Sequence, residues 1–274
     1  MNRSGTGSVN RTYNTDSPPT CHLDSHTALN RRPDILNIAA YRFVALDDLP
    51  ALRRWLEEVS MAAGLRGTVL LAAEGINLAV AGSAEGIAAL RAALDADHRL
   101  AGLGFRQSWS SAIPFKRLKV GIRKEIIAFG VSGIDPARAP APALAPEMLK
   151  AWLEEGREIV LLDTRNAFEV EHGSFAGAVH LGNHTFREFA AAARAFPPSR
   201  PGTPVVTFCT GGIRCEKAAP LLLQLGHRDV FQLSGGILGY LEHAGPDHYE
   251  GACFVFDERI GLGADLSPQN PEQL

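Results

Sequence analysis

A cysteine that stands between a strand-like segment and a helix-like segment constrains the fold of this chain most. Residues 204–208 are apolar enough for a buried strand, Cys209 follows directly, and residues 216–225 have the pattern of a helix. A strand that turns directly into a helix is typical of a mainly parallel sheet covered by helices. In such α/β folds ligands bind at the carboxyl ends of the strands, which is where Cys209 lies.

The loop that starts at Cys209 has the composition of a nucleophile's site. Backbone N–H groups and the positive end of a helix dipole favour the thiolate, and Arg214 adds a permanent charge and a planar set of donors for an anion. We therefore expect Cys209 and Arg214 to be catalytic. The active-site loop between them is expected to consist of Thr210, Gly211, Gly212 and Ile213. The alternative is a buried, inert cysteine at the start of a helix.

The remaining cysteines give weaker signals. Cys215 follows the loop and is either a resolving thiol that pairs with the loop cysteine after oxidation or a small buried helix residue. Cys253 lies in an apolar run and is expected to pack in a core. Cys21, His22 and His26 lie in a polar N-terminal region, where we expect no metal cluster. Because the cysteines lack paired ligand spacing, the sequence predicts no metal site.

The length of the loop separates two known chemistries. Four residues lie between Cys209 and Arg214, one fewer than in the Cys-x5-Arg loop of protein tyrosine phosphatase-like enzymes, and Phe208 stands where those enzymes have histidine. The loop resembles the active-site loop of the rhodanese domain, where the cysteine carries a persulfide. Residues 159–165, which end in Asp163-Thr164-Arg165 and are followed by Glu169 and by residues 172–173 and 175–178, are similar to the first rhodanese signature, and residues 229–236 resemble the strand and glycine turn after the active-site helix. We expect Asp163 and Arg165 to fix a loop, and the alternative is a catalytic role for this pair.

Motifs outside the loop point to a narrower family. They are residues 67–77, 114–120, 123–126, 163–166, 186–189, 209–218 and 253–259. The set resembles that of the bacterial oxygen-dependent tRNA uridine hydroxylases, rhodanese-like proteins that make 5-hydroxyuridine at the wobble position. The resemblance implies a tRNA anticodon loop as partner, molecular oxygen as co-substrate and no bound cofactor. Ala73 stands where the family often has proline, and the chain ends soon after Arg259, as in a short form without the cysteine-rich tail.

Length and composition favour a two-domain enzyme in the cytoplasm. The 274 residues are 46% hydrophobic and 21% charged, which suffices for two cores of roughly 100 residues each. A reactive thiol suits a reducing compartment, and we expect no signal peptide and no membrane contact. The expected parts are a disordered tail at 1–32, a ferredoxin-like (acylphosphatase-like) domain at 33–130, a semi-rigid Pro/Ala linker at 131–146, a rhodanese-like catalytic domain at 147–245 and a C-terminal extension at 246–274.

The first domain is expected to be an α+β sandwich. Its predicted strands are residues 35–44, 69–73, 78–81 and 105–111. One predicted helix starts with an acidic cap and Pro50 and runs to Gly64, and Ser83 caps a second helix that ends near Leu94. The resulting order β-α-β-β-α-β is that of a ferredoxin-like fold.

The second domain alternates predicted helices and strands. These are residues 146–155, 159–163, 186–195, 204–208, 216–225, 230–233 and 236–243. Such alternation predicts a mainly parallel sheet with helices on both faces. The chain contains no Gly-x-Gly-x-x-Gly turn, P-loop or His-Glu-x-x-His motif, so the sequence gives no support for nucleotide cofactors or catalytic metals.

A basic stretch near the end of the first domain is the best candidate for RNA contact. It comprises Lys116, Arg117, Lys119, Arg123 and Lys124. Residues 118–123 alternate in polarity, which places Lys119 and Arg123 on one face of a strand. The net charge is only -3, so a nucleic-acid-binding role requires a local basic surface of this kind. The alternative is an ordinary solvated face.

Three function classes remain open. In the first, wobble-uridine hydroxylation, the Cys209 thiolate adds to C6 of uracil, C5 reacts with oxygen, and Arg214 with the loop amides stabilises the enolate. In the second, rhodanese-type sulfur transfer, Cys209 takes sulfane sulfur from a persulfide donor and passes it to a thiol acceptor. The third, ranked lowest because Cys209 is present, is a non-catalytic interaction module. The sequence indicates neither the electron source nor the oligomeric state.

Overall fold

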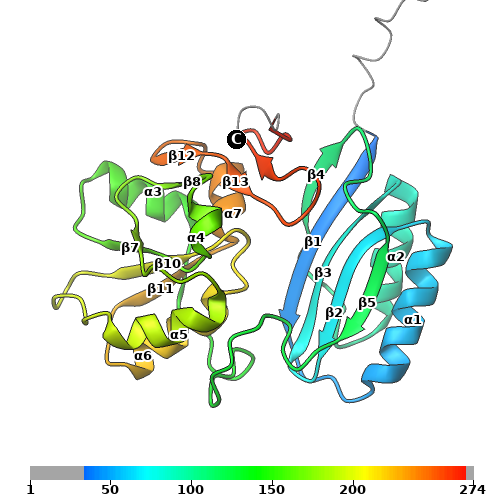
Figure 1. Ribbon diagram of the computed structural model, residues 1–274, viewed down its shortest axis with the longest axis horizontal. Coiled ribbons are helices and arrows are strands. Elements are labelled where there is room, and N and C mark those ends of the chain that lie inside the picture. The colour runs from blue at the N-terminus through cyan, green and yellow to red at the C-terminus, as the bar shows by residue number, and fades with distance from the viewer. Residues whose placement is uncertain (1–33, 270–274) are drawn as a thin grey trace, which may run out of the picture. The chain divides into compact units, whose positions relative to one another are not determined.

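Two five-stranded sheets organise the chain (Figure 1). The computed structural model describes residues 34–269, and these residues belong to one compact unit. The tail expected at 1–32, with Cys21, His22 and His26, lies outside the described residues.

The first sheet has the strand order β4-β1-β3-β2-β5. Its strands are β1 (Ile35–Phe43), β2 (Arg66–Ala72), β3 (Gly75–Gly82), β4 (Arg106–Ser110) and β5 (Leu118–Ile122). The first four pair antiparallel in the ferredoxin-like order, which confirms the predicted fold of this domain. β5 adds a fifth strand, parallel to β2, at the edge opposite β4.

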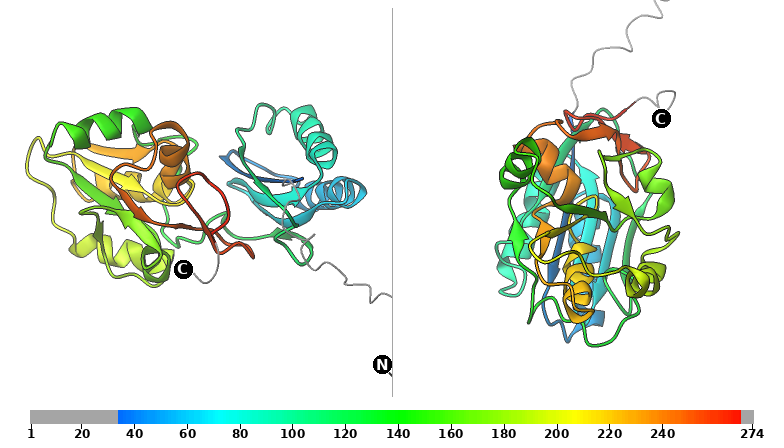
Figure 2. Two further views of the ribbon diagram at one scale, coloured as in Figure 1. Left: turned by 90° about the horizontal axis from the view of Figure 1, so that it is seen from above. Right: turned by 90° about the vertical axis from the view of Figure 1, so that its left-hand side faces the viewer.

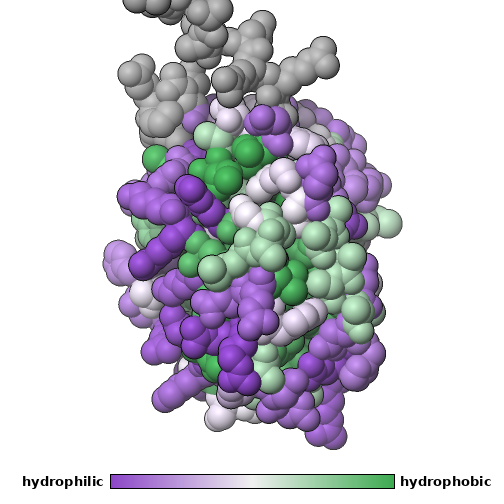
Figure 3. Space-filling model, turned by 90° about the vertical axis from the view of Figure 1, so that its right-hand side faces the viewer, coloured by the Kyte–Doolittle hydropathy of each residue, from purple (hydrophilic) through white to green (hydrophobic). Residues whose placement is uncertain are grey.

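Two helices, α1 (Leu49–Ala62) and α2 (Ala84–Ala96), cover one face of this sheet, and the other face carries no helix (Figure 1). Strand side chains alternate between the two faces, so Ile38, Leu78 and Val120 pack into a core with the helices. The molecular face on the side of α1 and α2 carries hydrophilic areas together with a region of hydrophobic side chains (Figure 3). The uncovered face of the sheet is therefore available for the second domain and for ligands.

The caps of the two helices differ from each other. The Ser83 hydroxyl accepts a hydrogen bond of 3.1 Å from the Gly86 N–H, as predicted. The acidic cap expected for α1 is wrong, because the Asp48 side chain caps no backbone N–H. Its carboxylate instead accepts a hydrogen bond of 2.7 Å from Arg99.

The second sheet is parallel, as predicted, with the order β6-β11-β10-β7-β9. Its strands are β6 (Ala143–Leu144), β7 (Val160–Asp163), β9 (Val179–His180), β10 (Val205–Phe208) and β11 (Val230–Leu233). β10 is the central strand, and all of its residues are buried. Its uninterrupted apolar run reflects this burial on both faces.

Helices cover both faces of the second sheet (Figure 2). They are α3 (Pro146–Glu154), α4 (Ala167–Val170), α5 (Phe186–Ala195), α6 (Cys215–Gln224) and α7 (Gly236–His243). Val205 packs with α5 and α6 on one face, whereas Val206 packs with α3 and α7 on the other. Short strands complete the domain: β8 (Gly173–Phe175) pairs with β12 (Tyr249–Gly251), and β13 (Cys253–Phe254) pairs with β14 (Gly261–Leu262).

The stretch expected to be a linker contributes to the second domain. Ala143 and Leu144 form β6, which pairs in parallel with β11. Ala141 is buried in the same core as Val131 and Ile134. These contacts hold the Pro/Ala segment against the second sheet. Among the helices formed by residues 34–269, none has the length and apolar character needed to cross a membrane.

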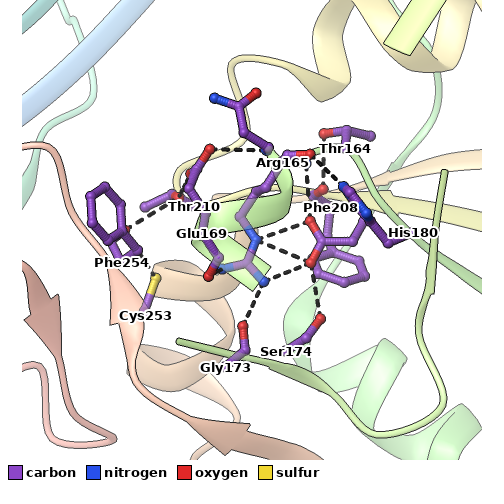
Figure 4. Close-up of polar contacts among 12 residues, drawn as sticks. Thr164, Arg165, Glu169, Gly173, Ser174, His180, Phe208, Thr210, Cys253 and Phe254 are labelled. Carbon is purple, nitrogen blue, oxygen red and sulfur yellow. Dashed lines mark hydrogen bonds and ion pairs between the residues drawn. The ribbon is translucent and has the colours of Figure 1, made fainter. Parts of the chain in front are cut away.

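A buried ion pair closes the end of β7. Arg165 Nη2 lies 2.6 Å from Asp163 Oδ2, and both side chains are 0% exposed. Arg165 also donates to the Gly173 carbonyl at 2.6 Å, and Ser174 donates to Asp163 at 2.9 Å (Figure 4). The pair ties the loop after β7 to β8, in agreement with the loop-fixing role expected from the sequence.

Asp163→Asn should lower the free energy of unfolding by about 3–5 kcal/mol, because it leaves the buried Arg165 charge without a counter-charge. Urea unfolding of the full chain measures this change. The matched control is Glu57→Gln, since Glu57 pairs with Arg53 at 3.5 Å on the surface of α1 and should cost less than about 1 kcal/mol. Equal stability losses in the two variants would contradict a structural role for the buried pair.

Candidate active site

Cys209 lies directly after β10, at the carboxyl end of the central strand. Its side chain is 0% exposed, and its Sγ accepts a hydrogen bond of 3.1 Å from the Gly212 N–H. The Cys209 carbonyl accepts a hydrogen bond from the Ile237 N–H of α7. A Cβ atom at Gly236 would lie 2.2 Å from this carbonyl oxygen, so only glycine permits the close approach of α7 to the loop.

The surroundings of Cys209 favour its thiolate. Burial acts to raise the pKa of Cys209, but the Cys215 thiol, the Arg214 charge and the N–H groups of Arg214 and Gly212 outweigh it and lower the pKa to about 6. Burial and the adjacent Cys209 raise the pKa of Cys215. At neutral pH the pair therefore carries one negative charge, located on Cys209.

Arg214 is held by the buried carboxylate of Glu169, a residue of the first rhodanese signature whose pairing with Arg214 the sequence did not predict. Its Nη1 and Nη2 atoms donate to Glu169 at 2.5 and 2.7 Å, and Nη2 is also 3.4 Å from the Thr210 hydroxyl. Glu169 lies on α4, and its carboxylate also accepts a hydrogen bond from the Asn166 N–H. The terminal nitrogens expected to bind an anion are thus paired with Glu169. Arg214 still lowers the pKa of Cys209 through its charge.

The other two cysteines within residues 34–269, Cys215 and Cys253, are buried and protonated at neutral pH. Cys215 is the first residue of α6, and its Sγ lies 3.8 Å from the Thr164 hydroxyl. Cys253 lies on β13, where burial raises its pKa to about 12. Packing thus accounts for Cys253, as expected, whereas Cys215 is both a buried helix residue and a direct neighbour of Cys209.

A cleft of about 1130 Å³ lies over Cys209. The uncovered face of the first sheet lines one side of it with Tyr41, Asn77 and Arg106, and the Cys209 loop lines another. Ligand sites typically measure about 300–1,000 Å³, so the cleft is large enough for a nucleotide together with part of its neighbours. Cys209 is one of the residues that line the cleft, and its thiolate is the nucleophile available there.

Two contacts hold the first sheet against this site. Tyr41 on β1 donates a hydrogen bond of 3.1 Å to Glu216 on α6. Burial and then the Glu216 charge raise the pKa of Tyr41, so its hydroxyl stays protonated. Arg106 on β4 pairs with Glu242 on α7 at 2.5 Å. A Cβ atom at Gly235 would lie 1.5 Å from the Arg106 guanidinium, so any other residue here would displace that side chain.

A third contact joins three of the motif segments. Lys217 on α6 is buried, and its Nζ lies 2.9 Å from both Glu74 and Glu125. Glu74 also accepts a hydrogen bond of 2.8 Å from the Ile126 N–H. The segments 67–77, 123–126 and 209–218, which are far apart in the sequence, therefore meet directly behind the active-site loop.

The basic candidates lie apart from Cys209. Lys116, Arg117, Lys119, Arg123 and Lys124 are all exposed, and none lines the cleft. They lie on or beside β5, the edge strand farthest from β4 in the strand order. The cleft has other arginines, Arg42, Arg187 and Arg259, of which the last two belong to motif segments. Among residues 34–269 there is no group of three or more His, Cys, Asp or Glu side chains placed to hold a metal ion.

Comparisons with known proteins agree with this architecture. A model of the UPF0176 acylphosphatase-like domain matches residues 35–126, and a model of the rhodanese-like domain matches residues 145–243. A tRNA uridine(34) hydroxylase of Variovorax paradoxus is 52% identical over 85% of this chain and 91% of its own length. One of Bordetella petrii is 49% identical over 86% of this chain and 96% of its own length. The chain belongs to the tRNA uridine(34) hydroxylase family.

Membership in this family confirms the resemblance drawn from the motif segments, and the chain is an enzyme of this family. The two domain models confirm the acylphosphatase-like and rhodanese-like folds. Among solved structures, a rhodanese-like domain from Anabaena sp. matches with 25% identity and a TM-score of 0.34, over 40% of this chain and 79% of its own.

The ionisation of Cys209 should be visible at mildly acidic pH. Because its pKa is lowered to about 6, the thiolate should be present at neutral pH and be lost as the pH falls through that value. The measurement is the thiolate ultraviolet absorbance of the wild type minus that of Cys209→Ser, followed across pH. Cys253→Ser should leave the titration unchanged. A midpoint at the ordinary cysteine value of 9.0 would contradict an activated thiol.

Proposed function

We propose that the protein hydroxylates C5 of uridine 34 in tRNA, with Cys209 as the nucleophile and molecular oxygen as co-substrate. The observation that carries the proposal is a thiolate held at the base of a cleft of about 1130 Å³, in a chain of the tRNA uridine(34) hydroxylase family. Uridine 34 lies in the single-stranded anticodon loop, where a base can be turned outward without breaking a duplex.

In the first step, the Cys209 thiolate adds to C6 of the uracil ring. The electron pair moves to C5 and the O4 carbonyl, which gives an enolate that is electron-rich at C5. We assign the stabilisation of this enolate to the loop N–H groups. The Arg214 guanidinium is already paired with Glu169, so its role is to fix the loop and to favour the thiolate.

In the second step, C5 reacts with molecular oxygen. One oxygen atom becomes the C5 hydroxyl group, and the other leaves as water after taking up two electrons and two protons. The first product is a hydroperoxide at C5, formed as the peroxide anion takes up a proton. The Cys215 thiol, which lies directly beside Cys209, takes the outer oxygen atom, so that C5 keeps a hydroxyl group and Cys215 becomes a sulfenic acid. Loss of the C5 proton then expels the Cys209 thiolate from C6 and restores the C5=C6 double bond. The freed thiolate attacks the Cys215 sulfenic acid, which gives a disulfide between the two cysteines and releases the second oxygen atom as water. The reducing cytoplasm suits this cycle, since an external dithiol would regenerate both cysteines.

The proposal is tested in a strain that lacks the gene for this protein, complemented with each variant. Cys209→Ser should abolish 5-hydroxyuridine in tRNA, because an alcohol is not ionised near neutral pH. Cys253→Ser should restore the modification to the wild-type level, since Cys253 is protonated and packed in a core. Mass spectrometry of tRNA nucleosides measures the product, and a thermal melt checks folding.

A folded Cys209→Ser protein that restores the modification would contradict the role of Cys209. The alternative function, sulfur transfer through a Cys209 persulfide, is motivated by the amide-lined loop closed by Arg214. Rapid turnover of thiosulfate by the purified protein, together with unchanged nucleosides in the deletion strain, would favour that alternative.

We also assign RNA phosphate contact to the basic stretch along β5. Val120 packs into the helix-covered core, so its neighbour Lys119 lies on the uncovered face of the sheet that also lines the cleft. An RNA strand that enters the cleft can cross this face. Phosphate contacts there would add affinity that does not depend on sequence.

Replacing Lys119 and Arg123 by Glu should therefore weaken tRNA binding. The slope of the logarithm of the binding constant against the logarithm of the salt concentration should become shallower by about two. Fluorescence anisotropy of labelled tRNA at several salt concentrations measures both quantities. Arg54→Glu, an exposed change on α1 at the opposite face of the sheet, is the control and should have little effect. Unchanged affinity and slope in the double variant would locate RNA binding elsewhere.

A further inference from the structure

Three aromatic side chains gather beside the Cys209 cleft without any role in the steps above. Phe254 lies half-buried on β13, and its ring centroid is 5.1 Å from that of Phe256 and 5.2 Å from that of Phe168. Both neighbouring rings stand nearly perpendicular to it. Phe254 therefore packs against the more exposed rings of Phe168 and Phe256. We refer to these three residues as the aromatic platform.

The platform is exposed although its members are apolar. Phe256 is 64% exposed and Phe168 is 41% exposed, and Phe256 lines the cleft that contains Cys209. Large exposed aromatic groups at the rim of a site are typical of surfaces that bind a partner. Within residues 34–269, no other large hydrophobic side chain that lines this cleft has comparable exposure.

The surrounding backbone fixes the platform in place. Val255 donates a backbone hydrogen bond of 2.8 Å to the Ile260 carbonyl, and Arg259 donates to Ser108 on β4 at 2.6 Å. Phe168 lies on α4 next to Glu169, the residue that binds Arg214. The same short helix therefore carries an outer ring of the platform and the carboxylate that holds the active-site loop.

The charge of the cleft rim indicates the kind of partner. Arg187 at the start of α5 is exposed, lines the same cleft, and makes no ion pair within residues 34–269. Exposed aromatic rings together with an unpaired guanidinium are the combination by which proteins bind single-stranded nucleic acid, with bases stacked on the rings and phosphates on the charge. Phe256 lines the same cleft as Cys209, so the occupant we assign to the platform is the RNA whose target nucleotide enters that cleft.

We propose that the aromatic platform stacks an unpaired nucleobase that neighbours uridine 34, while uridine 34 itself enters the cleft toward Cys209. This inference rests on the proposed function for the identity of the RNA. Phe256 is the stacking residue, and Phe254 and Phe168 set the orientation of its ring. Arg187 contacts the phosphate that links the stacked base to the target nucleotide.

The test measures binding of an anticodon stem-loop RNA to the full chain by fluorescence anisotropy. Phe256→Ala should raise the Kd by about 5- to 150-fold, the range that base–aromatic stacking supplies, whereas Phe256→Trp should keep it near the wild-type value. Met61→Ala on α1 removes a side chain of similar exposure, 67%, away from the cleft and should leave the Kd unchanged. The Cys209 thiolate titration should be unaltered in all three variants.

An RNA with an abasic nucleotide beside uridine 34 provides a second arm. The wild type should bind this abasic RNA as weakly as Phe256→Ala binds the intact RNA. The affinity of Phe256→Ala for the abasic RNA should be no lower than its affinity for the intact RNA. Equal affinity of wild type and Phe256→Ala for the intact RNA would overturn the inference, as would an effect of Phe256→Ala confined to self-association in sedimentation. The binding assay involves no turnover, so a wild type that stacks RNA but makes no 5-hydroxyuridine would reject the proposed function and leave this inference standing.

Discussion

The bidentate ion pair between Arg214 and Glu169 is the interaction on which the rest of the site depends. Both side chains are buried, so water cannot solvate their charges, and each charge is neutralised by the other. Through it the Cys209 loop is fixed to α4, and the Arg214 charge remains close enough to Cys209 to lower the pKa of that thiol. A loop held in this way offers backbone N–H groups in a fixed arrangement, which is what a developing anion requires.

The second constraint is the contact between the active-site helix and the first sheet. The first three residues of α6 contact different parts of the molecule. Cys215 lies beside Cys209, and Glu216 accepts a hydrogen bond from Tyr41. Lys217 forms ion pairs with Glu74 and Glu125. The uncovered face of the first sheet is thereby held over the thiolate. The first domain thus forms one wall of the cleft, and a rhodanese-like domain alone would lack that wall.

The sequence was most informative where structure is determined locally. The strand before Cys209, the helix after it and the parallel sheet follow from short-range hydrophobic patterns, and Ser83 caps its helix through a contact three residues away. The pairing of Glu169 with Arg214 was not predicted because the two residues are 45 positions apart, and no local pattern signals such a pair. Asp48 was assigned as a cap because a competing partner, Arg99, lies 51 residues further along the chain. The contacts of Lys217 were not predicted either, because Glu74 and Glu125 lie 143 and 92 residues away from it in the sequence.

The central claim, that the Cys209 thiolate adds to C6 of uridine 34, is tested most directly by trapping the adduct. Anticodon stem-loop RNA with 5-fluorouridine at that position is incubated with the protein in the absence of oxygen, and the cross-linked peptide is mapped by mass spectrometry. Fluorine makes C6 more electrophilic, and without oxygen the adduct cannot proceed to product. The account predicts a covalent link at Cys209 that is absent from Cys209→Ser. A link at another residue, or equal labelling of Cys209→Ser, would contradict it.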